Sequence, residues 1–381
     1  MINNKWANAL LGNARAFIRS WRLPKWEVSG KERFSDLPIT LVYFGHDFGF
    51  RTISQKVFAP GYTAKRTGSA WLGAPGFPLT PTNQEGDIVA IEIDPVRWRA
   101  HDTGSGFLLP LWSRTSIRVE DACRQMKTSS SLKDDLRRIR KNSIVCETSG
   151  SSSDLRTFYE RMYIPYIAAL HGELSLPDSW ETIVDTERCG ELIVAKGSNG
   201  DPIGGIVVGR NAENMYARSL GLISHEKELL KTGVMSALYR ACFERARSYG
   251  YDRVGFGLTG SFLNDGLLRF KKKWGLQLVG GCKQGIWLQF NNATPAVGSF
   301  LTNNPFIYHQ ADKIHGATFV EDAEFMDDES LRKLHVDYYL PNMESLHICP
   351  IKSDEGQSPI PQALAGHLVW GTNRRLFAEA T

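Results

Sequence analysis

The spacing of hydrophobic and polar residues along the chain changes near Leu155. Before it, three short apolar runs bounded by turn residues predict strands: ITLVYFG, DIVAIEI and FLLPLW. Stretches rich in glycine and proline, such as TGSAWLGAPGFPLTPT, separate them and are typical of connections. The first 127 residues therefore predict an irregular α/β lobe.

After Leu155 the pattern predicts a regular series of elements. LRTFYERMYIPYIAALHG has helical spacing, and ELIVAKG, IGGIVVGR and NMYARSLGLI read as strands. TGVMSALYRACFERARSYG predicts the clearest helix, with Thr232 as its N-cap and Gly250 at its end. The strand YDRVGFG, the short helix NDGLLRFKKKW and the strand GIWLQF complete the series, which we place at residues 151–292.

A helix and a polar stretch lie between these parts. SSSLKDDLRRIRKNS predicts a helix capped by Ser131, with basic residues near its C-terminal end, where the helix dipole favours them. SGSSSD at 149–154 is typical of a flexible boundary. Because 381 residues exceed the usual size of one core, we expect two lobes, at 1–150 and 151–292. Residues 293–381 would form a C-terminal extension, for which packing on the first lobe is one option.

The composition is that of a soluble globular protein, with 42% hydrophobic and 23% charged residues. No stretch supplies the roughly 20 apolar residues of a membrane-spanning helix. The six cysteines form no CxxC pair, so neither a disulfide framework nor a zinc site is indicated and we expect a cytoplasmic location. HExxH, HxH and GxSxG motifs are also absent, so we expect no metal site and no serine-hydrolase chemistry.

The N-terminal segment MINNKWANALLGNARAFIRSWRLPKW places apolar residues at helical spacing with arginines between them. The basic residues interrupt the hydrophobic run, which is not typical of a signal peptide. Such a helix could lie on a membrane surface. We expect it to pack against its own domain instead, because aromatic stripes at this spacing usually face a core.

Charge is distributed unevenly, although the net charge is only +4. This small excess does not indicate DNA binding. No Asp or Glu occurs between Gly266 and Ala311, a span that contains five basic residues: Arg269, Lys271, Lys272, Lys273 and Lys283. We therefore expect a locally positive surface that suits an anionic ligand.

Two sets of motifs resemble known families. NMYARSLGLISHEKELLKTGVMSALYRACFERARSYGYDRVGFG is similar to the centre of the GNAT acyltransferases, in which a strand ends at a short loop where the next helix starts. DLRRIRKN, FYERMY and GLLRFKKKWG resemble the Fem-type aminoacyl transferases and related acyltransferases, which have two GNAT-like lobes and a lysine in the corresponding Phe-Lys pair. The resemblance covers residues 130–280. It implies a mixed α/β sheet of GNAT type, and transfer of an acyl or aminoacyl group from an activated donor to an amine.

The resemblance also implies a catalytic residue. Asn264, Leu267 and Phe270 occupy three positions of the family pattern, and Lys271 stands where the usual acid tyrosine stands. Acyl transfer to an amine passes through a tetrahedral intermediate whose oxygen gains negative charge, which Lys271 could stabilise. Lys271 could instead protonate the leaving group. The alternative is a solvated helix end, and since neighbouring helical residues point about 100° apart, we expect at most one of the three lysines to face the site.

The donor would be acyl-CoA or aminoacyl-tRNA, with no tightly bound cofactor. By resemblance, the donor pairs with the backbone of four residues: Ser219, Leu220, Gly221 and Leu222. The loop that usually cradles the coenzyme A diphosphate reads LKTGVM here, with Gly233 retained. Leu230 and Met235 replace its polar first and small last residues, which puts coenzyme A in doubt, although Lys231 and Thr232 could partly compensate.

The acceptor would be a small-molecule or peptide amine that enters between the lobes. Four basic residues could contact its anionic end, or the phosphates of a tRNA: Arg137, Arg138, Arg140 and Lys141. Equally, they could simply complement a helix dipole. The competing hypothesis for the whole protein is a GNAT-like binding protein whose donor loop has decayed.

Overall fold

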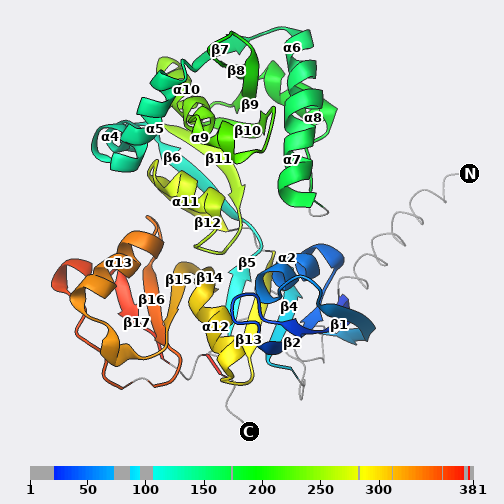
Figure 1. Ribbon diagram of the computed structural model, residues 1–381, viewed down its shortest axis with the longest axis vertical. Coiled ribbons are helices and arrows are strands. Elements are labelled where there is room, and N and C mark those ends of the chain that lie inside the picture. The colour runs from blue at the N-terminus through cyan, green and yellow to red at the C-terminus, as the bar shows by residue number, and fades with distance from the viewer. Residues whose placement is uncertain are drawn as a thin grey trace, which may run out of the picture. The chain divides into compact units, whose positions relative to one another are not determined.

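The computed structural model describes residues 21–72, 86–94, 106–172, 175–281, 284–310, 312–353, 355–372 and 376–377. The expected N-terminal helix therefore lies mostly outside the described residues. The chain forms two compact units (Figure 1). Unit 1 takes its described residues from Met1–Ser113, Gly260–Asp265 and Gly281–Thr381, and unit 2 from Arg114–Thr259 and Gly266–Gly280. Each unit has its own mixed sheet, which confirms the expected α/β class with two lobes.

Unit 1 is built on a ten-stranded sheet with the order β17-β16-β15-β14-β5-β13-β4-β2-β1-β3. Its strands are β1 (Arg22–Lys31), β2 (Pro38–Phe44), β3 (Thr63–Trp71), β4 (Ile88–Ile93), β5 (Phe107–Pro110), β13 (Gly285–Phe290), β14 (Phe306–Gln310), β15 (Lys313–Val320), β16 (Ser345–Pro350) and β17 (Leu368–Trp370). Its helices are α2 (Asp47–Val57), α12 (Pro295–Asn303) and α13 (Asp328–Tyr338), with short 3₁₀ turns at Ala323–Phe325 and Gln362–Leu364.

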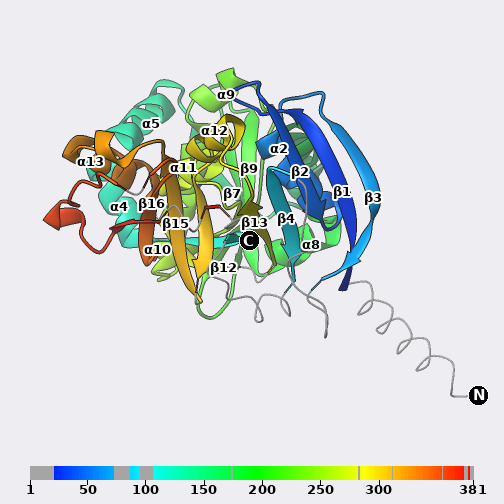
Figure 2. The same ribbon diagram turned by 90° about the horizontal axis from the view of Figure 1, so that it is seen from below.

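The core of unit 1 follows the alternation of side chains along its strands. Leu41 and Tyr43 of β2 pack in a large cluster that includes residues of α2 and α12, which cover this face (Figure 2). Val42 and Phe44 belong to a second cluster. Because both faces are buried, β2 is an almost continuous apolar run, as the sequence indicates.

Unit 2 contains a seven-stranded sheet with the order β12-β6-β11-β10-β9-β8-β7. Its strands are β6 (Ser113–Arg118), β7 (Val145–Ser149), β8 (Gly190–Lys196), β9 (Pro202–Arg210), β10 (Met215–Leu222), β11 (Arg253–Thr259) and β12 (Leu276–Gly281). Its helices are α4 (Val119–Thr128), α5 (Ser130–Lys141), α6 (Ser152–Thr157), the π-helix η1 (Phe158–Tyr163), α7 (Ile164–His171), α8 (Trp180–Arg188), α9 (Lys227–Lys231), α10 (Val234–Ser248) and α11 (Gly266–Lys272).

The central part of unit 2 has the expected order of strands and helices. Strands β8, β9 and β10 form an antiparallel meander. Helix α10 then leads to β11, which pairs with β10 in parallel. Helix α10 ends before Gly250, whose φ of 79° suits a glycine after a helix, as the sequence predicts.

The boundaries between units differ from those expected. The stretch at 149–154 joins β7 to α6 inside unit 2, because β7 pairs with β8 at the edge of the same sheet. GIWLQF forms β13, which pairs with β4 and β5 and so belongs to unit 1. Residues 281–381 add five strands to the unit 1 sheet, beginning with β13. TGSAW, expected in a connection, lies in β3 and pairs with β1.

The predicted helix at LRTFYERMYIPYIAALHG is present, but its middle is a π-helix. Pro165 has no N–H group, and its ring would clash with the carbonyl of Arg161 in a regular α-helix. A wider turn immediately before the proline relieves that conflict. The backbone of this π-helix passes so close to Gly221 that a Cβ there would lie 2.5 Å from the nitrogen of Tyr163.

Candidate functional site

A cavity of about 760 Å³ lies in unit 2, where β10 and β11 diverge. The two strands pair only at Met215–Val254 and Tyr216–Gly255, whereas β9 follows β10 as far as Leu222. Beyond Tyr216 the edge of β10 that faces β11 is therefore open, and both strands line the cavity there. An open strand edge can pair with an extended ligand, so this geometry suits a ligand that presents an amide or carbonyl group.

Two local features accompany the divergence. The β9–β10 register shifts between Ala217 and Ser219, so Arg218 lies in a β-bulge. On β11, Gly257 has a φ of 65°, in the left-handed region that favours glycine. Bulges redirect side chains, and Arg218 lines the cavity.

Lys271, the predicted catalytic residue, is 2% exposed and lines the cavity. Its ammonium donates hydrogen bonds to the carbonyl oxygens of Phe256 (2.7 Å) and Leu258 (3.1 Å) and to Oγ1 of Thr115 (3.2 Å). An ammonium has three N–H donors, and here each has an acceptor. Since Thr115 belongs to β6 and the carbonyls to β11, Lys271 fixes a positive charge between these strands.

Lys273 also lines the cavity, so the expectation that at most one lysine faces it is wrong. Helix α11 ends at Lys272, and the helical angle between successive side chains no longer applies to the next residue. The Lys273 ammonium pairs with the buried carboxylate of Asp135 and lies 4.5 Å from the centre of the Phe270 ring. Two fixed cations therefore come from the lysine run.

Asp135 joins α5 to the start of α10. Its carboxylate accepts a hydrogen bond from Oγ of Ser236 (2.5 Å) and lies 3.6 Å from Nη1 of Arg138. A Cβ on Gly233 would lie 3.1 Å from Ile139 and 3.2 Å from the Asp135 carbonyl oxygen. Helix α5 therefore covers the start of α10, and an acidic side chain lies there.

Thr232 does not cap α10, contrary to the sequence prediction. The N-cap is Gly233, with a φ of 95°, and Thr232 is the C-cap of α9. The Thr232 hydroxyl donates to the carbonyl of Leu229, and its own carbonyl accepts from Nδ2 of Asn142 on the α5 side. Similarly, α5 is capped by Ser129 and not by Ser131.

A second carboxylate, that of the partly buried Asp178, organises the opposite side of the cavity and was missed by the sequence analysis. It accepts hydrogen bonds from Nε (3.1 Å) and Nη2 (2.6 Å) of Arg218 and from Oγ of Ser219 (2.7 Å). These bonds raise the pKa of Arg218 above its usual value. The hydroxyl of Tyr163 accepts from the Asp178 backbone N–H, and burial raises the pKa of that phenol.

The predicted site residues divide into two groups. Those that line the cavity are Ser219, Leu220, Gly233, Leu267, Phe270, Lys271 and Arg138. Those outside its lining are Gly221, Leu222, Lys231, Thr232, Asn264, Arg137, Arg140 and Lys141. The reasons are local: Asn264 belongs to unit 1 and donates to the carbonyl of Asn303, and Arg137 pairs with Asp134 on the exposed face of α5.

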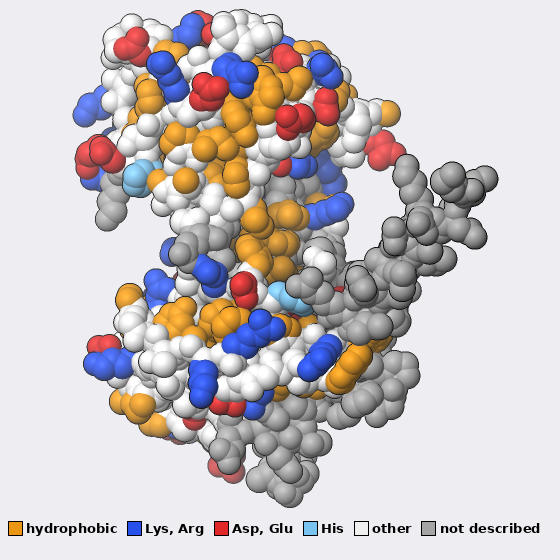
Figure 3. Space-filling view, turned by 90° about the vertical axis from the view of Figure 1, so that its right-hand side faces the viewer, with side chains coloured by type: hydrophobic (Ala, Val, Ile, Leu, Met, Phe, Trp, Pro, Cys, Tyr) orange, Lys and Arg blue, Asp and Glu red, His pale blue; other side chains and the backbone are white. Residues whose placement is uncertain are grey.

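The wall of the cavity is mainly apolar between its charged groups. Tyr166 and Leu170 of α7, Met235 and Tyr239 of α10, and Leu258 all contribute. Leu170 is 48% exposed and Leu258 46%, so the mouth is apolar as well. Figure 3 shows apolar side chains gathered on a face of unit 2.

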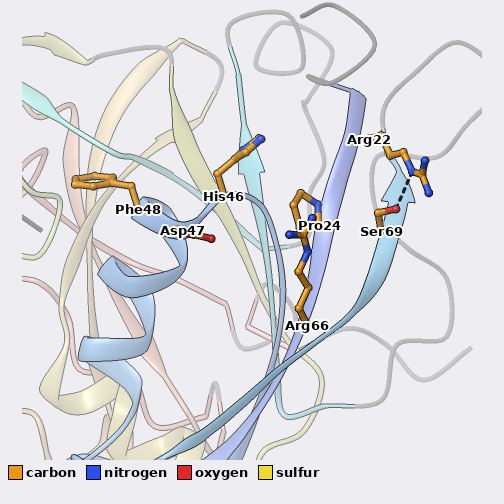
Figure 4. A pocket seen from close by; sticks show the side chains of 7 residues that line it. All are labelled: Arg22, Pro24, His46, Asp47, Phe48, Arg66 and Ser69. Atoms are coloured by element: carbon orange, nitrogen blue, oxygen red, sulfur yellow. Dashed lines mark hydrogen bonds between the residues drawn. The ribbon is translucent and has the colours of Figure 1, made fainter. Parts of the chain in front are cut away.

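A hollow of about 700 Å³ also lies in unit 1 (Figure 4). Arg22 and Arg66, from β1 and β3, and His46, before α2, contribute to its lining. Arg22 donates to Oγ of Ser69, and His46 lies 3.1 Å from the Glu92 carboxylate. These lining side chains are exposed, whereas Lys271 and Asp135 in the unit 2 cavity are buried. Because buried charged groups are held in place by their surroundings, the unit 2 cavity is the stronger candidate site.

Within the residues that the structure describes, no group of three or more His, Cys, Asp or Glu side chains is placed to hold a metal ion. In the same residues, no helix combines the length and the apolar character needed to cross a membrane.

Unit 2 is an α/β unit with a mixed seven-stranded sheet in which β10 and β11 diverge. No protein-family model and no curated protein sequence matches the chain. Solved structures that are similar include FemX, at 15% identity and a TM-score of 0.37, covering 67% of this chain and 82% of that one.

L-PGS from Bacillus licheniformis is similar at 13% identity and a TM-score of 0.36, covering 73% of this chain and 88% of that one. A GCN5-related N-acetyltransferase from Sphaerobacter thermophilus is similar at 13% identity and a TM-score of 0.34, covering 66% and 72%. At these identities the likeness is one of fold alone, and nothing about chemistry follows from it.

Proposed function

We propose that the protein is an acyltransferase that moves an acyl or aminoacyl group from an activated donor to an amine and forms an amide. The observation that carries this proposal is the cavity at the open edge of β10, with two fixed lysine charges in its wall. An extended donor would pair with the backbone at Ser219 and Leu220. Its carbonyl carbon would then lie beside the two lysine charges of the cavity wall.

In the proposed reaction the amine nitrogen attacks the donor carbonyl. A C–N bond forms, the C–O or C–S bond to the carrier breaks, the amine loses a proton and the carrier gains one. The carbonyl oxygen is negative in the intermediate, and preorganised positive charge stabilises it without rearrangement of the site. Lys271 supplies this charge from a buried position, and Lys273 supplies a second one that Asp135 and Phe270 hold in place.

Of the two donors, the covered start of α10 favours aminoacyl-tRNA over acyl-CoA. Asp135 and Met235 lie where a coenzyme A diphosphate would approach, and the packing of α5 against Gly233 leaves little room for phosphate at these backbone N–H groups. The exposed basic face of α5, with Arg137 and Arg138, offers contacts for a tRNA backbone instead. This donor is made in the cytoplasm, which is the location we propose.

The test compares thermal stabilisation of the full chain by acetyl-CoA, coenzyme A, aminoacylated tRNA and the same tRNA without its amino acid. We expect aminoacylated tRNA to raise the melting temperature most. Coenzyme A raising it alone would indicate the ordinary GNAT donor and overturn the choice of tRNA. Transfer itself is measured as radiolabelled amino acid that becomes resistant to mild alkali, because an amide survives conditions that cleave the tRNA ester.

A non-catalytic binding protein is the second candidate. The observation that favours it is the saturation of the Lys271 ammonium by acceptors within unit 2, which leaves no N–H directed at a ligand. Under this alternative, a ligand binds in the cavity but no alkali-resistant product forms with any donor.

A further inference from the structure

We infer that Arg218 recognises an anionic group, a carboxylate or a phosphate, on the carbon that bears the acceptor's amine. This inference rests on the proposed function, because it identifies the class of acceptor. It concerns a residue that lies inside a predicted strand and outside every basic cluster of the sequence.

The position of Arg218 is the first observation. Arg218 lies in the bulge of β10 and lines the cavity with a side chain that is 48% exposed, next to Ser219 at the open edge. The acceptor's amine must meet the donor carbonyl beside this edge. Any group on the carbon that carries the amine is therefore close to residue 218.

The rigidity of Arg218 is the second observation. The Asp178 carboxylate accepts hydrogen bonds from Nε and Nη2 of Arg218. Asp178 is held in turn by two hydroxyls: that of Ser219 donates to its carboxylate, and that of Tyr163 accepts from its backbone N–H. A guanidinium fixed on one side loses little side-chain entropy when the remaining nitrogen binds an anion. In the part of the chain that the structure describes, Nη1 has no hydrogen-bond partner, and it is the nitrogen left for a ligand.

The charge of the cavity is the third observation. Four basic residues line it, namely Arg138, Arg218, Lys271 and Lys273, against one acidic residue, Asp135. Asp178 behind Arg218 brings the acidic groups to two, which leaves a net positive charge of two. A zwitterionic acceptor, whose anionic group offsets its own ammonium, would leave this excess unchanged, whereas a simple amine, protonated in water, would add to it.

The apolar part of the cavity wall indicates which other substituent the acceptor carries. Tyr166, Ile167 and Leu170 of α7 line the cavity together with Leu220, next along β10 from Ser219. These side chains suit an apolar substituent. An apolar α-amino acid, or its phosphonate counterpart, combines an amine, an anion and an apolar chain on one carbon.

The experiment uses three matched probes: L-norleucine, L-norleucinamide and 1-aminopentylphosphonate. Dissociation constants are measured by calorimetry with the full chain. We expect norleucine or the phosphonate to bind at least tenfold more tightly than norleucinamide, which lacks the anionic group. Comparing norleucine with the phosphonate decides between carboxylate and phosphate. The amino acid of an aminoacyl ester has no free carboxylate, so this preference identifies the acceptor and not the donor.

The variant Arg218→Gln should lose the preference, so that all three probes bind alike. Arg188→Gln, at the exposed end of α8 where Arg188 pairs with Asp185, is the matched control and should keep it. Arg218→Lys retains the charge and should keep part of the preference, which distinguishes loss of recognition from loss of folding. Circular dichroism checks the fold of each variant.

Equal binding of the amide and the two probes that carry an anionic group by the wild type would overturn the inference, as would failure of all three to bind. An unchanged preference in Arg218→Gln would overturn it too. These measurements need no donor and no turnover. The inference can therefore fail while amide formation succeeds, and the proposed function can fail while Arg218 is shown to bind the anion.

Discussion

Lys271 is almost completely buried, which is rare for lysine. The ammonium is tolerated because carbonyl oxygens of β11 and the hydroxyl of Thr115 take the place of water. In a sheet, carbonyls such as those of Phe256 and Leu258 would ordinarily accept from a neighbouring strand. Lys271 therefore contributes to the shape of the cavity as well as to its charge.

Replacement of Lys271 by Met should separate these contributions. The apolar stem is kept, but the acceptors lose their donor, and an unsatisfied buried group costs about 1–3 kcal/mol. We expect the free energy of unfolding, measured in urea, to fall by at least about 2 kcal/mol. Where the variant is still folded, amide formation should fall by on the order of 10²-fold, the usual effect of losing one such stabilising charge.

The matched control is Lys133→Met, at an exposed position of α5, for which we expect no measurable change. Full stability in Lys271→Met would mean that other donors satisfy the carbonyls. Full turnover would remove Lys271 from the mechanism.

The sequence predicted which side chains line the cavity where they belong to one regular helix or strand. Phe270 and Lys271 both lie on α11 and both line the cavity. Lys273 was missed because its direction depends on where α11 ends, and Arg218 because its direction depends on a bulge. A lone arginine within a buried strand is the signal that could have drawn attention to residue 218.

At the scale of elements, the π-helix and β10 meet through backbone atoms. A Cβ on Gly221 would lie 2.5–2.7 Å from backbone atoms of Tyr163 and Met162. This contact places Tyr163, a wall residue of the cavity that also holds Asp178. The glycine is thus needed for close approach and not for an unusual φ.

The substitution Gly221→Ala should therefore be costly. Backbone atoms cannot rotate away, so the π-helix must shift, and overpacking of this kind costs about 1–3 kcal/mol. We expect a lower urea midpoint at unchanged slope. Gly255→Ala on β11 is the control, because its nearest neighbour would be Cβ of Tyr216 at an ordinary 3.5 Å.

Equal stability of the two alanine variants would show that the contact between β10 and the π-helix is loose. A large loss confined to Gly221→Ala, together with weaker norleucine binding, would show that this contact also positions the Arg218–Asp178 pair.

At the scale of the whole molecule, the chain passes repeatedly between the units. It leaves unit 1 after Ser113, returns for Gly260–Asp265, and returns again from Gly281. Periodicity along the chain predicted most strands and helices of unit 2, because each element covers one face of a local sheet. It could not assign β13, which is buried along most of its length and pairs with β4 and β5 from a distant part of the sequence. A buried apolar run indicates a central strand but does not indicate in which sheet.

This arrangement predicts different fates for two fragments. All strands of the unit 2 sheet lie between Ser113 and Gly281, so residues 113–281 should fold and unfold cooperatively. Residues 1–280 lack β13, which lies between β5 and β4 in the unit 1 sheet, and also lack core residues such as Phe300 and Phe306. In this longer fragment we expect trypsin to cleave rapidly between residues 21 and 72 while unit 2 survives. Protection of residues 21–72 in fragment 1–280 would mean that the N-terminal strands form a stable sheet without their central partner, and the division into units would have to be redrawn.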